Sequence, residues 1–241
     1  MSKPNEEEFW TYYQLYQRPT YSLPEVKERQ ESVVRLLKRK RCQGGSLLEI
    51  GFGSGYLLEL CHKDFQCTGL DISQANVELT RNEFYEKGLK DVSFVAADIH
   101  TYIPEKAFDV AVACHVLEHF NDDELSDVFA KIYNILTEDG LFFGAVPYKQ
   151  NLALSKVFCP RCGHIFDKDE HKQSFDELSL CKKLTESGFT VQVLNTHVRG
   201  NQYYQQSLVR RLLRRVYWVT IGFKPTNGLE FVALKKTIGH K

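Results

Sequence analysis

Three closely spaced glycines and three acidic side chains are the residues of this chain whose spacing best indicates ligand chemistry. Gly51, Gly53 and Gly55 occur at alternate positions in LLEIGFGSGYL, after a short apolar segment and before a helical pattern. Because glycine has no Cβ, such a turn lets the backbone approach a ligand closely, and the helix start offers unpaired N–H groups. Dinucleotide folds and plain strand-to-helix turns produce the same glycine pattern.

The acids make the pattern more specific. Glu49 lies two residues before the first glycine, Asp71 ends the apolar segment FQCTGLDIS, and Asp98 lies in VAADI. An acid at the carboxyl end of the second strand of such a fold can accept hydrogen bonds from both hydroxyls of a ribose. The sequence therefore predicts a ligand that contains a nucleoside.

Together with LTEDGLFFGAVP at residues 136–147, these motifs resemble the class I S-adenosylmethionine-dependent methyltransferases, in particular the ubiquinone-type and sugar O-methyltransferase group. The resemblance covers about residues 33–196 and a last strand near the C terminus. It implies an α/β fold with a Rossmann-like, doubly wound sheet of seven strands. It also implies that the glycines border the methionine part of S-adenosylmethionine, that Asp71 holds the ribose, and that Ile72 and Asp98 contact the adenine. The full cofactor-binding set that it implies is Glu49, Gly51, Gly53, Gly55, Asp71, Ile72, Asp98, Ile99, Cys114 and His115.

A second group of polar side chains follows the fourth predicted strand, in CHVLEHF at residues 114–120. Open α/β sheets bind ligands at the carboxyl ends of their strands, so His115, Glu118 and His119 are expected at or near the cleft. His119 could take the proton from an acceptor hydroxyl, because an unperturbed imidazole titrates at about pH 6.5. It could instead only hydrogen-bond to backbone at a helix start. His171 stands in an HxxxF arrangement that similar methyltransferases share, which makes it a second candidate for a catalytic role on the acceptor side.

The stretch VFCPRCGHIFDKDEHKQSF at residues 157–175 has the CxxC spacing of a zinc knuckle. Cys159, Cys162, His164 and His171 are its candidate zinc ligands. The sequence has no second CxxC to complete a zinc site, so the histidines would have to supply the other ligands. With four protein ligands the site would be closed, and with three it would keep an open coordination position. The alternatives are a thiol-bearing loop without metal and a redox-sensitive cysteine pair.

Composition and charge limit the classes of function. The chain has 241 residues, 43% of them hydrophobic, and a formal net charge of zero, so nothing global indicates a nucleic-acid partner. Seven cysteines, an odd number with several in apparent core segments, suit a reducing compartment. The N terminus has no basic and apolar leader pattern, and the chain has no run of 18 apolar residues. A cytoplasmic protein is expected.

Strands and helices alternate in a βαβ rhythm that predicts a parallel sheet within one domain spanning residues 1–241. The aromatic N-terminal segment, within 1–41, is either a short helix on the domain edge or a flap over the ligand. Residues 42–150 form the cofactor-binding half, 151–175 the CxxC insertion after the fifth strand, and 176–241 the acceptor-side part. The predicted strands are 47–50, 65–72, 92–96, 108–114, 141–146, 190–196 and 229–235, and the predicted helices 25–41, 74–86, 122–136 and 175–187.

Between the last two predicted strands, residues 208–219 form an amphipathic pattern with valines and leucines on one side and arginines on the other. As a basic helix, this insertion could make peripheral contact with an anionic membrane or hold an anionic substrate. It could equally pack its apolar side on its own domain and leave the arginines in water.

The resemblance favours a methyltransferase that acts on an oxygen of a small-molecule acceptor. One alternative is an RNA or protein methyltransferase that uses the basic helix, although the neutral net charge makes nucleic acid the less expected partner. Another is a non-catalytic module that binds the cofactor or zinc. The ExGxGxG and LTEDG motifs speak against a nicotinamide dehydrogenase. The sequence does not indicate an oligomeric state.

Overall fold

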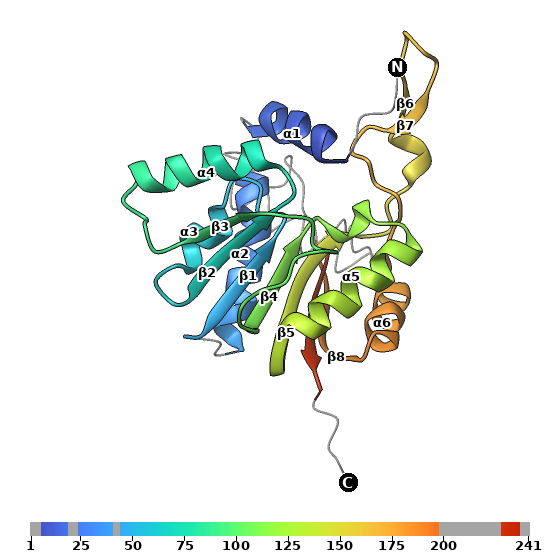
Figure 1. Cartoon of the computed structure of the whole chain (residues 1–241). Helices are drawn as coiled ribbons and strands as arrows, with labels where there is room; N and C mark the ends of the chain where they lie inside the picture. The colour runs from blue at the N-terminus through green and yellow to red at the C-terminus, as the bar shows by residue number, and fades with distance from the viewer. Residues whose placement is uncertain (1–5, 19–23, 41–43, 198–227, 237–241) are drawn as a thin grey trace, which may run out of the picture.

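A seven-stranded sheet in the order β3-β2-β1-β4-β5-β9-β8 forms the centre of the molecule (Figure 1). The computed structural model describes residues 6–18, 24–40, 44–197 and 228–236. Strands β1 to β5 pair in parallel, whereas β9 lies antiparallel between β5 and β8. The strands are β1 (Ser46–Ile50), β2 (Gln66–Asp71), β3 (Ser93–Ala96), β4 (Phe108–Cys114), β5 (Leu136–Pro147), β8 (Phe189–His197) and β9 (Gly228–Lys235).

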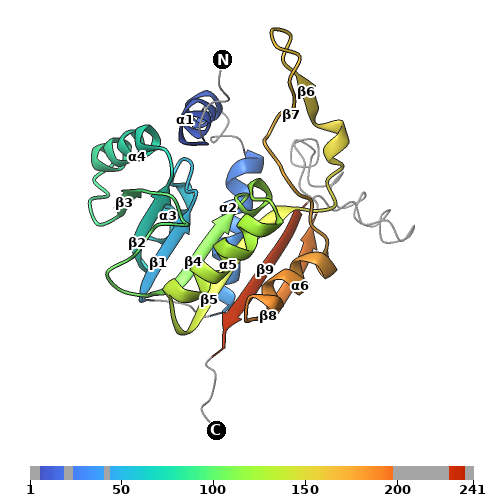
Figure 2. The same cartoon turned by 45° about the vertical axis from the view of Figure 1, so that its right-hand side comes forward.

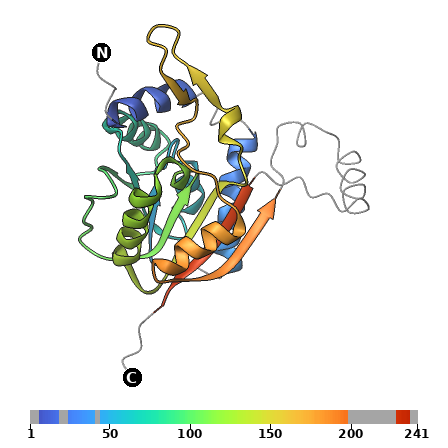
Figure 3. The same cartoon turned by 90° about the vertical axis from the view of Figure 1, so that its right-hand side faces the viewer.

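Helices cover both faces of the sheet and bury two apolar layers. The helices are α2 (Pro24–Arg39), α3 (Tyr56–Cys61) and α4 (Gln74–Glu86) on one face, and α5 (Asp122–Ile135) and α6 (Glu177–Glu186) on the other (Figures 2 and 3). Fully apolar strand segments such as Val110–Ala113 are buried from both sides, which is why they read as continuous hydrophobic runs. The predicted doubly wound, Rossmann-like fold class is confirmed.

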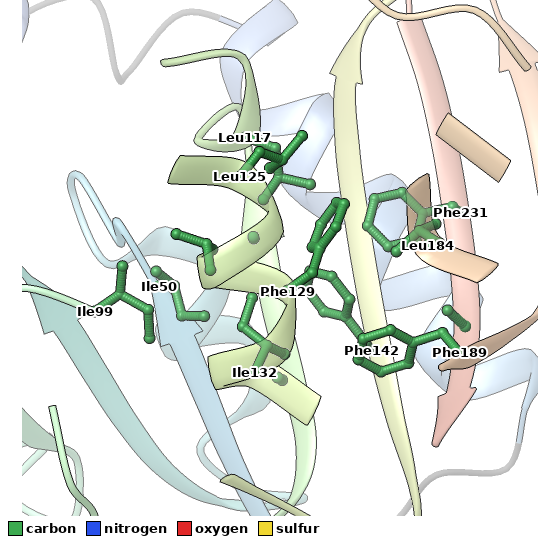
Figure 4. Close-up of a cluster of buried hydrophobic side chains, with 14 of the residues drawn as sticks. Ile50, Ile99, Leu117, Leu125, Phe129, Ile132, Phe142, Leu184, Phe189 and Phe231 are labelled. Atoms are coloured by element: carbon green, nitrogen blue, oxygen red, sulfur yellow. The ribbon is translucent and has the colours of Figure 1, made fainter. Parts of the chain in front are cut away.

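Aromatic side chains tie the last strand, β9, into this core (Figure 4). Phe231 of β9 packs edge-to-face against Phe142 of β5, with ring centroids 5.0 Å apart, and Phe142 in turn contacts Phe189 of β8 at 5.6 Å. All three rings are buried. Burying one such ring stabilises the fold by about 1.5–3 kcal/mol, so β9 is held by packing as well as by its two strand ladders.

Two predicted boundaries are wrong for identifiable reasons. Strand β5 begins at Leu136 and not at residue 141, because Leu136 already pairs with Phe108 of β4. The next pair, Val110 with Leu141, follows a register shift, and the intervening residues include Asp139 at φ 59°. The helix predicted from residue 175 begins at Glu177. Asp176 caps it in a reciprocal arrangement with Ser179, while Phe175 forms a parallel bridge with Tyr148.

Helix α1, a β-hairpin and two short 3-10 helices surround the carboxyl end of the sheet. Helix α1 (Glu6–Gln17) lies above this end, and the hairpin β6 (Lys156–Phe158) and β7 (Ile165–Asp167) extends away from the body (Figures 1 and 2). A 3-10 helix, η2 (Leu117–His119), follows β4, and a second, η3 (Leu152–Leu154), precedes the hairpin. Among the described helices, none combines the length and the apolar character needed to cross a bilayer. The basic helix predicted at 208–219 lies outside the described residues.

Candidate active site

Two adjoining cavities lie at the carboxyl ends of the parallel strands. The smaller lobe, of about 120 Å³, extends over the ends of β1 and β2, and the larger lobe, of about 390 Å³, extends toward β4 and residues 169–171. This is the switch point of the sheet, where β1 lies between β2 and β4 and the chain passes from β3 at one edge to β4 on the other side of β1. Both lobes share five lining residues: Trp10, Gln14, Gly51, His115 and His119.

Of the three glycines of the turn, Gly51 lines both lobes, Gly53 lines the larger lobe, and Gly55 lines neither. Gly51, Gly53 and Gly55 all have positive φ values, of 65°, 56° and 73°, which side chains with a Cβ rarely adopt. A Cβ on Gly51 would lie 2.6 Å from Val116 Cγ2. Glycine is therefore needed at this position for two reasons: it allows the positive φ, and it leaves room for the loop after β4.

Glu49 lies in β1 behind this turn and lines neither cavity in the described structure. Its side chain is only 1% exposed, and burial raises the pKa of its carboxyl well above the usual range, with the nearby Asp71 charge adding to the effect. The Leu58 N–H donates to the carboxylate, but Oε2 has no hydrogen-bond partner among the described residues. The geometry is consistent with a role in orienting the turn, and the place of Glu49 in the cofactor-binding set stays a prediction.

Asp71 occupies the end of β2 and faces the smaller lobe. Its Oδ1 accepts from Ser73 N–H at 3.0 Å, and its Oδ2 accepts from Asn76 Nδ2 at 3.0 Å. Burial raises its pKa to about 6, against the opposing effect of these hydrogen bonds. Asn76 Nδ2 also donates to the Gly53 carbonyl at 3.0 Å, so one amide ties the acid to the glycine turn.

The remaining predicted residues of the nucleoside side line the same lobe. Ile72 and Ile99 give it apolar walls, and Asp98 lies beside them. Asp98 Oδ1 also accepts from the His100 backbone N–H at 2.9 Å and lies 2.8 Å from His100 Nδ1. The carboxylate of Asp98 therefore closes a turn in addition to facing the cavity.

The polar side chains of CHVLEHF differ in which of the two lobes they line. Cys114 and Glu118 line the larger lobe, while His115 lines both lobes. Glu118 is fully buried, which raises the pKa of its carboxyl to about 8, and its Oε1 lies 3.1 Å from His115 Nδ1. Its Oε2 has no hydrogen-bond partner among the described residues.

His119, one of the two predicted catalytic histidines, lines both lobes but is a weak base in this environment. Burial and, to a smaller extent, the neighbouring His171 lower its pKa to about 3. Its Nδ1 lies 3.3 Å from the Glu170 carbonyl oxygen, and its ring meets Trp10 edge-to-face at 4.5 Å. A neutral, tightly packed imidazole gives the predicted role as general base no support.

His171, the other predicted catalytic histidine, also lines the larger lobe, where burial lowers its pKa. Its Nδ1 lies 2.6 Å from Gln150 Oε1, and its Nε2 lies 3.9 Å from Glu118 Oε1. The ring centroids of His119 and His171 are 5.0 Å apart. The structure thus brings the two candidates together with Glu118.

Helix α1 forms the roof of the site. Trp10 and Gln14 line both lobes, which favours the flap interpretation of the N-terminal segment over an edge helix. At one end of α1, Arg18 forms hydrogen bonds with Glu83, Asn76 and Thr80 of α4. At the other end, Lys172 lies 3.2 Å from Glu6 and 3.1 Å from Glu124. The roof is therefore tethered on both sides of the cleft.

Sequence reasoning missed several lining residues. Arg29 and Gln30 of α2 and Tyr13 of α1 reach the larger lobe, and Gln30 Oε1 is buried without a hydrogen-bond partner among the described residues. Burial raises the pKa of Tyr13 to about 12. In the sequence, these residues look like the polar side of a surface helix, and no spacing pattern separates them from solvated neighbours.

The predicted zinc ligands are not brought together as one set. Cys159 and Cys162 lie in the turn between β6 and β7, where backbone N–H groups of Cys162 and Arg161 lower the pKa of Cys159. The His164 ring stacks on Phe166, whereas His171 lies in the cleft. Within the described ranges, the groups of three potential metal ligands contain no cysteine. The structure gives the zinc site no support.

Comparison with known proteins agrees with this geometry. A protein family described as "Methyltransferase domain" matches residues 24–194, more than half of the chain. EEF1A lysine methyltransferase 2 of Danio rerio is 32% identical over 122 residues, which are 46% of this chain and 52% of that protein. The ubiquinone biosynthesis O-methyltransferase of Paramagnetospirillum magneticum is 32% identical over 104 residues, 43% of this chain and 41% of that protein. The chain thus spans about half the length of these relatives.

Among solved structures, the 1,6-didemethyltoxoflavin-N1-methyltransferase of Burkholderia thailandensis, with bound 1,6-didemethyltoxoflavin and S-adenosylhomocysteine, has a TM-score of 0.67 to this chain. The identity is 15%, over 98% of this chain and 93% of that one, so the likeness concerns the fold. The family match and the seven-stranded sheet with its glycine turn lead to the same conclusion: the chain belongs to the methyltransferase-domain family and has the class I methyltransferase fold.

Proposed function

We propose that this protein binds S-adenosylmethionine in the cleft beneath α1 and transfers its methyl group to an oxygen of a small-molecule acceptor. The observation that carries the proposal is the smaller lobe, where a buried acid at the end of β2, a crowded glycine turn and two isoleucines meet. Asp71 would accept from the ribose hydroxyls, while Ile72 and Ile99 would enclose the adenine.

The residues present fit this cofactor. Backbone beside Gly51 and Gly53 is open to the cleft because neither residue has a Cβ, and an added Cβ at Gly51 would collide with Val116. S-adenosylmethionine supplies a methyl group on a positively charged sulfur, which is already a strong electrophile. The protein then has to align the acceptor with that methyl group and exclude water, which is where much of the rate enhancement arises.

The larger lobe is the proposed acceptor site. Transfer to a hydroxyl forms a carbon–oxygen bond, breaks the methyl–sulfur bond and releases the hydroxyl proton, so a hydroxyl acceptor needs polar groups beside it. Glu118, His171 and Asp169 line this lobe. The ubiquinone O-methyltransferase relatives support an oxygen acceptor, whereas the relative named as a lysine methyltransferase makes a protein amine the second candidate.

Calorimetric titration with S-adenosylhomocysteine tests the cofactor site. We expect micromolar binding that Asp71→Ala abolishes and that the matched surface variant Asp91→Ala leaves unchanged, because Asp91 is exposed and pairs only with His62 in the described structure. Methyl transfer from labelled S-adenosylmethionine is then measured with hydroxyl-bearing small molecules, with amines and with lysine peptides. Folded wild-type protein that fails to bind S-adenosylhomocysteine would contradict the proposal, and transfer to amines alone would contradict its oxygen specificity.

A further inference from the structure

Three side chains that can bind a metal converge in the larger lobe. The ligand atoms of Glu118, His119 and His171 all lie within 4.8 Å of one another. Glu118 and His119 belong to η2, directly after β4, whereas His171 comes from the segment that follows the hairpin, more than fifty residues later. A set of two imidazoles and one carboxylate has therefore been assembled by the fold and not by sequence proximity.

Backbone hydrogen bonds hold the two segments in this arrangement. The carbonyl of Glu118 accepts from the N–H of Lys172 at 2.8 Å and from that of Gln173 at 3.3 Å. The side chain of Gln173 donates to the Phe120 carbonyl. His171 is thereby fixed opposite η2 independently of any contact between the side chains of the cluster.

Each histidine has one ring nitrogen engaged by an oxygen outside the cluster. His171 Nδ1 lies 2.6 Å from Gln150 Oε1, which leaves Nε2 on the side of Glu118. His119 Nδ1 lies 3.3 Å from the Glu170 carbonyl, and its ring also contacts the backbone of His115. Metal-binding histidines almost always use their second ring nitrogen in this way, because the outer hydrogen bond fixes the tautomer and the ring orientation.

Glu118 gives an independent indication of a missing positive partner. The side chain has no exposed surface, its Oε1 faces His115 Nδ1, and its Oε2 has no hydrogen-bond partner among the described residues. A buried carboxylate oxygen without a partner is costly, because the folded protein offers nothing in place of its lost hydration. A cation bound at the lobe side would remove this cost.

We propose that Glu118, His119 and His171 bind a divalent transition-metal cation within the acceptor lobe. Two imidazoles with one carboxylate suit Fe²⁺, Mn²⁺, Co²⁺ or Zn²⁺ better than Mg²⁺ or Ca²⁺, which prefer oxygen ligands. Asp169 lines the same lobe and belongs to a second, overlapping group with Asp167 and His171, so an additional oxygen is within reach. This site is separate from the CxxC turn.

The role of the cation rests on the proposed function, whereas its binding does not. Three protein ligands leave coordination positions open toward the larger lobe, where the acceptor is placed. A hydroxyl that binds to the cation there loses its proton more readily, because the positive charge stabilises the resulting oxygen anion. This would activate the acceptor hydroxyl without a separate general base.

The site is tested by titrating metal-free protein with Mn²⁺ and with Zn²⁺. Calorimetry measures the binding of both ions, and electron paramagnetic resonance measures the bound Mn²⁺. We expect one equivalent of cation in the wild type. Loss of an outer hydrogen bond typically lowers metal affinity about 10- to 100-fold, so Glu118→Gln and His171→Ala, which remove direct ligands, should weaken binding at least about 100-fold. Two controls should bind as the wild type does: His62→Ala, whose imidazole pairs with exposed Asp91, and the double variant Cys159→Ser/Cys162→Ser.

S-adenosylhomocysteine binding by every variant checks that the fold is intact and separates the two proposals. Wild-type protein that binds S-adenosylhomocysteine but takes up no cation would overturn the metal site and leave the proposed function standing. A cation that persists in Glu118→Gln and disappears in the double cysteine variant would also overturn it, in favour of the hairpin. Cation uptake without S-adenosylhomocysteine binding would instead contradict the proposed function alone.

Discussion

At the end of β2, Asp71 combines deep burial with a hydrogen bond to each of its two carboxylate oxygens, and this combination controls when its carboxyl is charged. Only 4% of the residue is exposed, and burial raises its pKa to about 6. Ser73 and Asn76 hold the two oxygens in place without neutralising them. The acid proposed to bind a ribose is thus ionised at neutral pH, but only by a margin of about one pH unit.

Binding of S-adenosylhomocysteine should therefore weaken as the pH falls through 6. The ionised carboxylate accepts from both ribose hydroxyls, so affinity is full above the pKa of about 6 and is lost below it, by up to about tenfold per pH unit. Calorimetry from pH 5 to pH 8 measures this. Asp71→Asn should bind about 10- to 100-fold more weakly at pH 8 and show a flat profile. An equal pH slope in that variant would assign the titration to another group.

Gly51 and Gly88 form a matched pair for testing the glycine turn. Both have positive φ, of 65° and 77°, so alanine at either position costs about 1–2 kcal/mol of backbone strain. Only at Gly51 would the new methyl meet a neighbour, Val116, since nothing lies within 4 Å at Gly88. Gly51→Ala should abolish S-adenosylhomocysteine binding in calorimetry, while Gly88→Ala should lower the free energy of unfolding and leave binding intact. Equal binding by both variants would contradict a role of the turn in the site.

Among the elements, α1 is the one whose position adds most to the site. It supplies Trp10 and Gln14 to both lobes, and Arg18 at its end donates to Asn76 Oδ1 at 2.9 Å. Asn76 in turn donates to Asp71 and to the Gly53 carbonyl. The amide side chain of Asn76 therefore links helix α1, the carboxylate of Asp71 and the glycine turn.

Arg18→Ala should loosen the roof and weaken S-adenosylhomocysteine binding roughly tenfold, or about 1.4 kcal/mol, because it removes the hydrogen bonds to Glu83, Asn76 and Thr80. The chain has two tryptophans, so Trp218→Phe leaves Trp10 as a fluorescent reporter of α1. We expect ligand binding to change Trp10 emission, and Arg18→Ala to reduce that change. Arg35→Ala is the control, since Arg35 is half exposed and pairs only with Glu31 in the described structure. Identical titrations for both variants would contradict the tether.

The elements that bury apolar residues could be predicted from the sequence, and those held by polar contacts could not. The continuous apolar runs of β1 and β4 predicted buried parallel strands, and the acid after β2 predicted the ribose side of the cleft. By contrast, the placement of α1 depends on contacts such as Arg18 with Glu83, which join residues 65 positions apart and leave no local pattern. His171 shows the same limit, because its spacing from CxxC indicated zinc while the fold placed it beside Glu118.

At the scale of the whole molecule, stability rests on the two apolar layers and not on the hairpin. Phe231 is fully buried between β5 and β8, whereas Phe158 in β6 is 68% exposed. Phe231→Ala should lower the free energy of unfolding by about 3–5 kcal/mol, because the cavity it leaves lies in the middle of the core. Phe158→Ala should change it by less than about 0.5 kcal/mol. Denaturant unfolding measures both, and similar losses for the two variants would show that the hairpin is part of the stabilising core.

The antiparallel strand β9 lies between β5 and β8, although it follows both of them along the chain. During synthesis on the ribosome, β8 therefore leaves the exit tunnel before the strand that joins it to the sheet exists. Until Gly228–Lys235 emerges, the β5 edge, with Phe142 and Phe143, has no partner. Unpaired apolar edges invite association with other chains. Nascent chains arrested before residue 228 should hence depend on chaperones, because the sheet is completed only after Gly228–Lys235 has been synthesised.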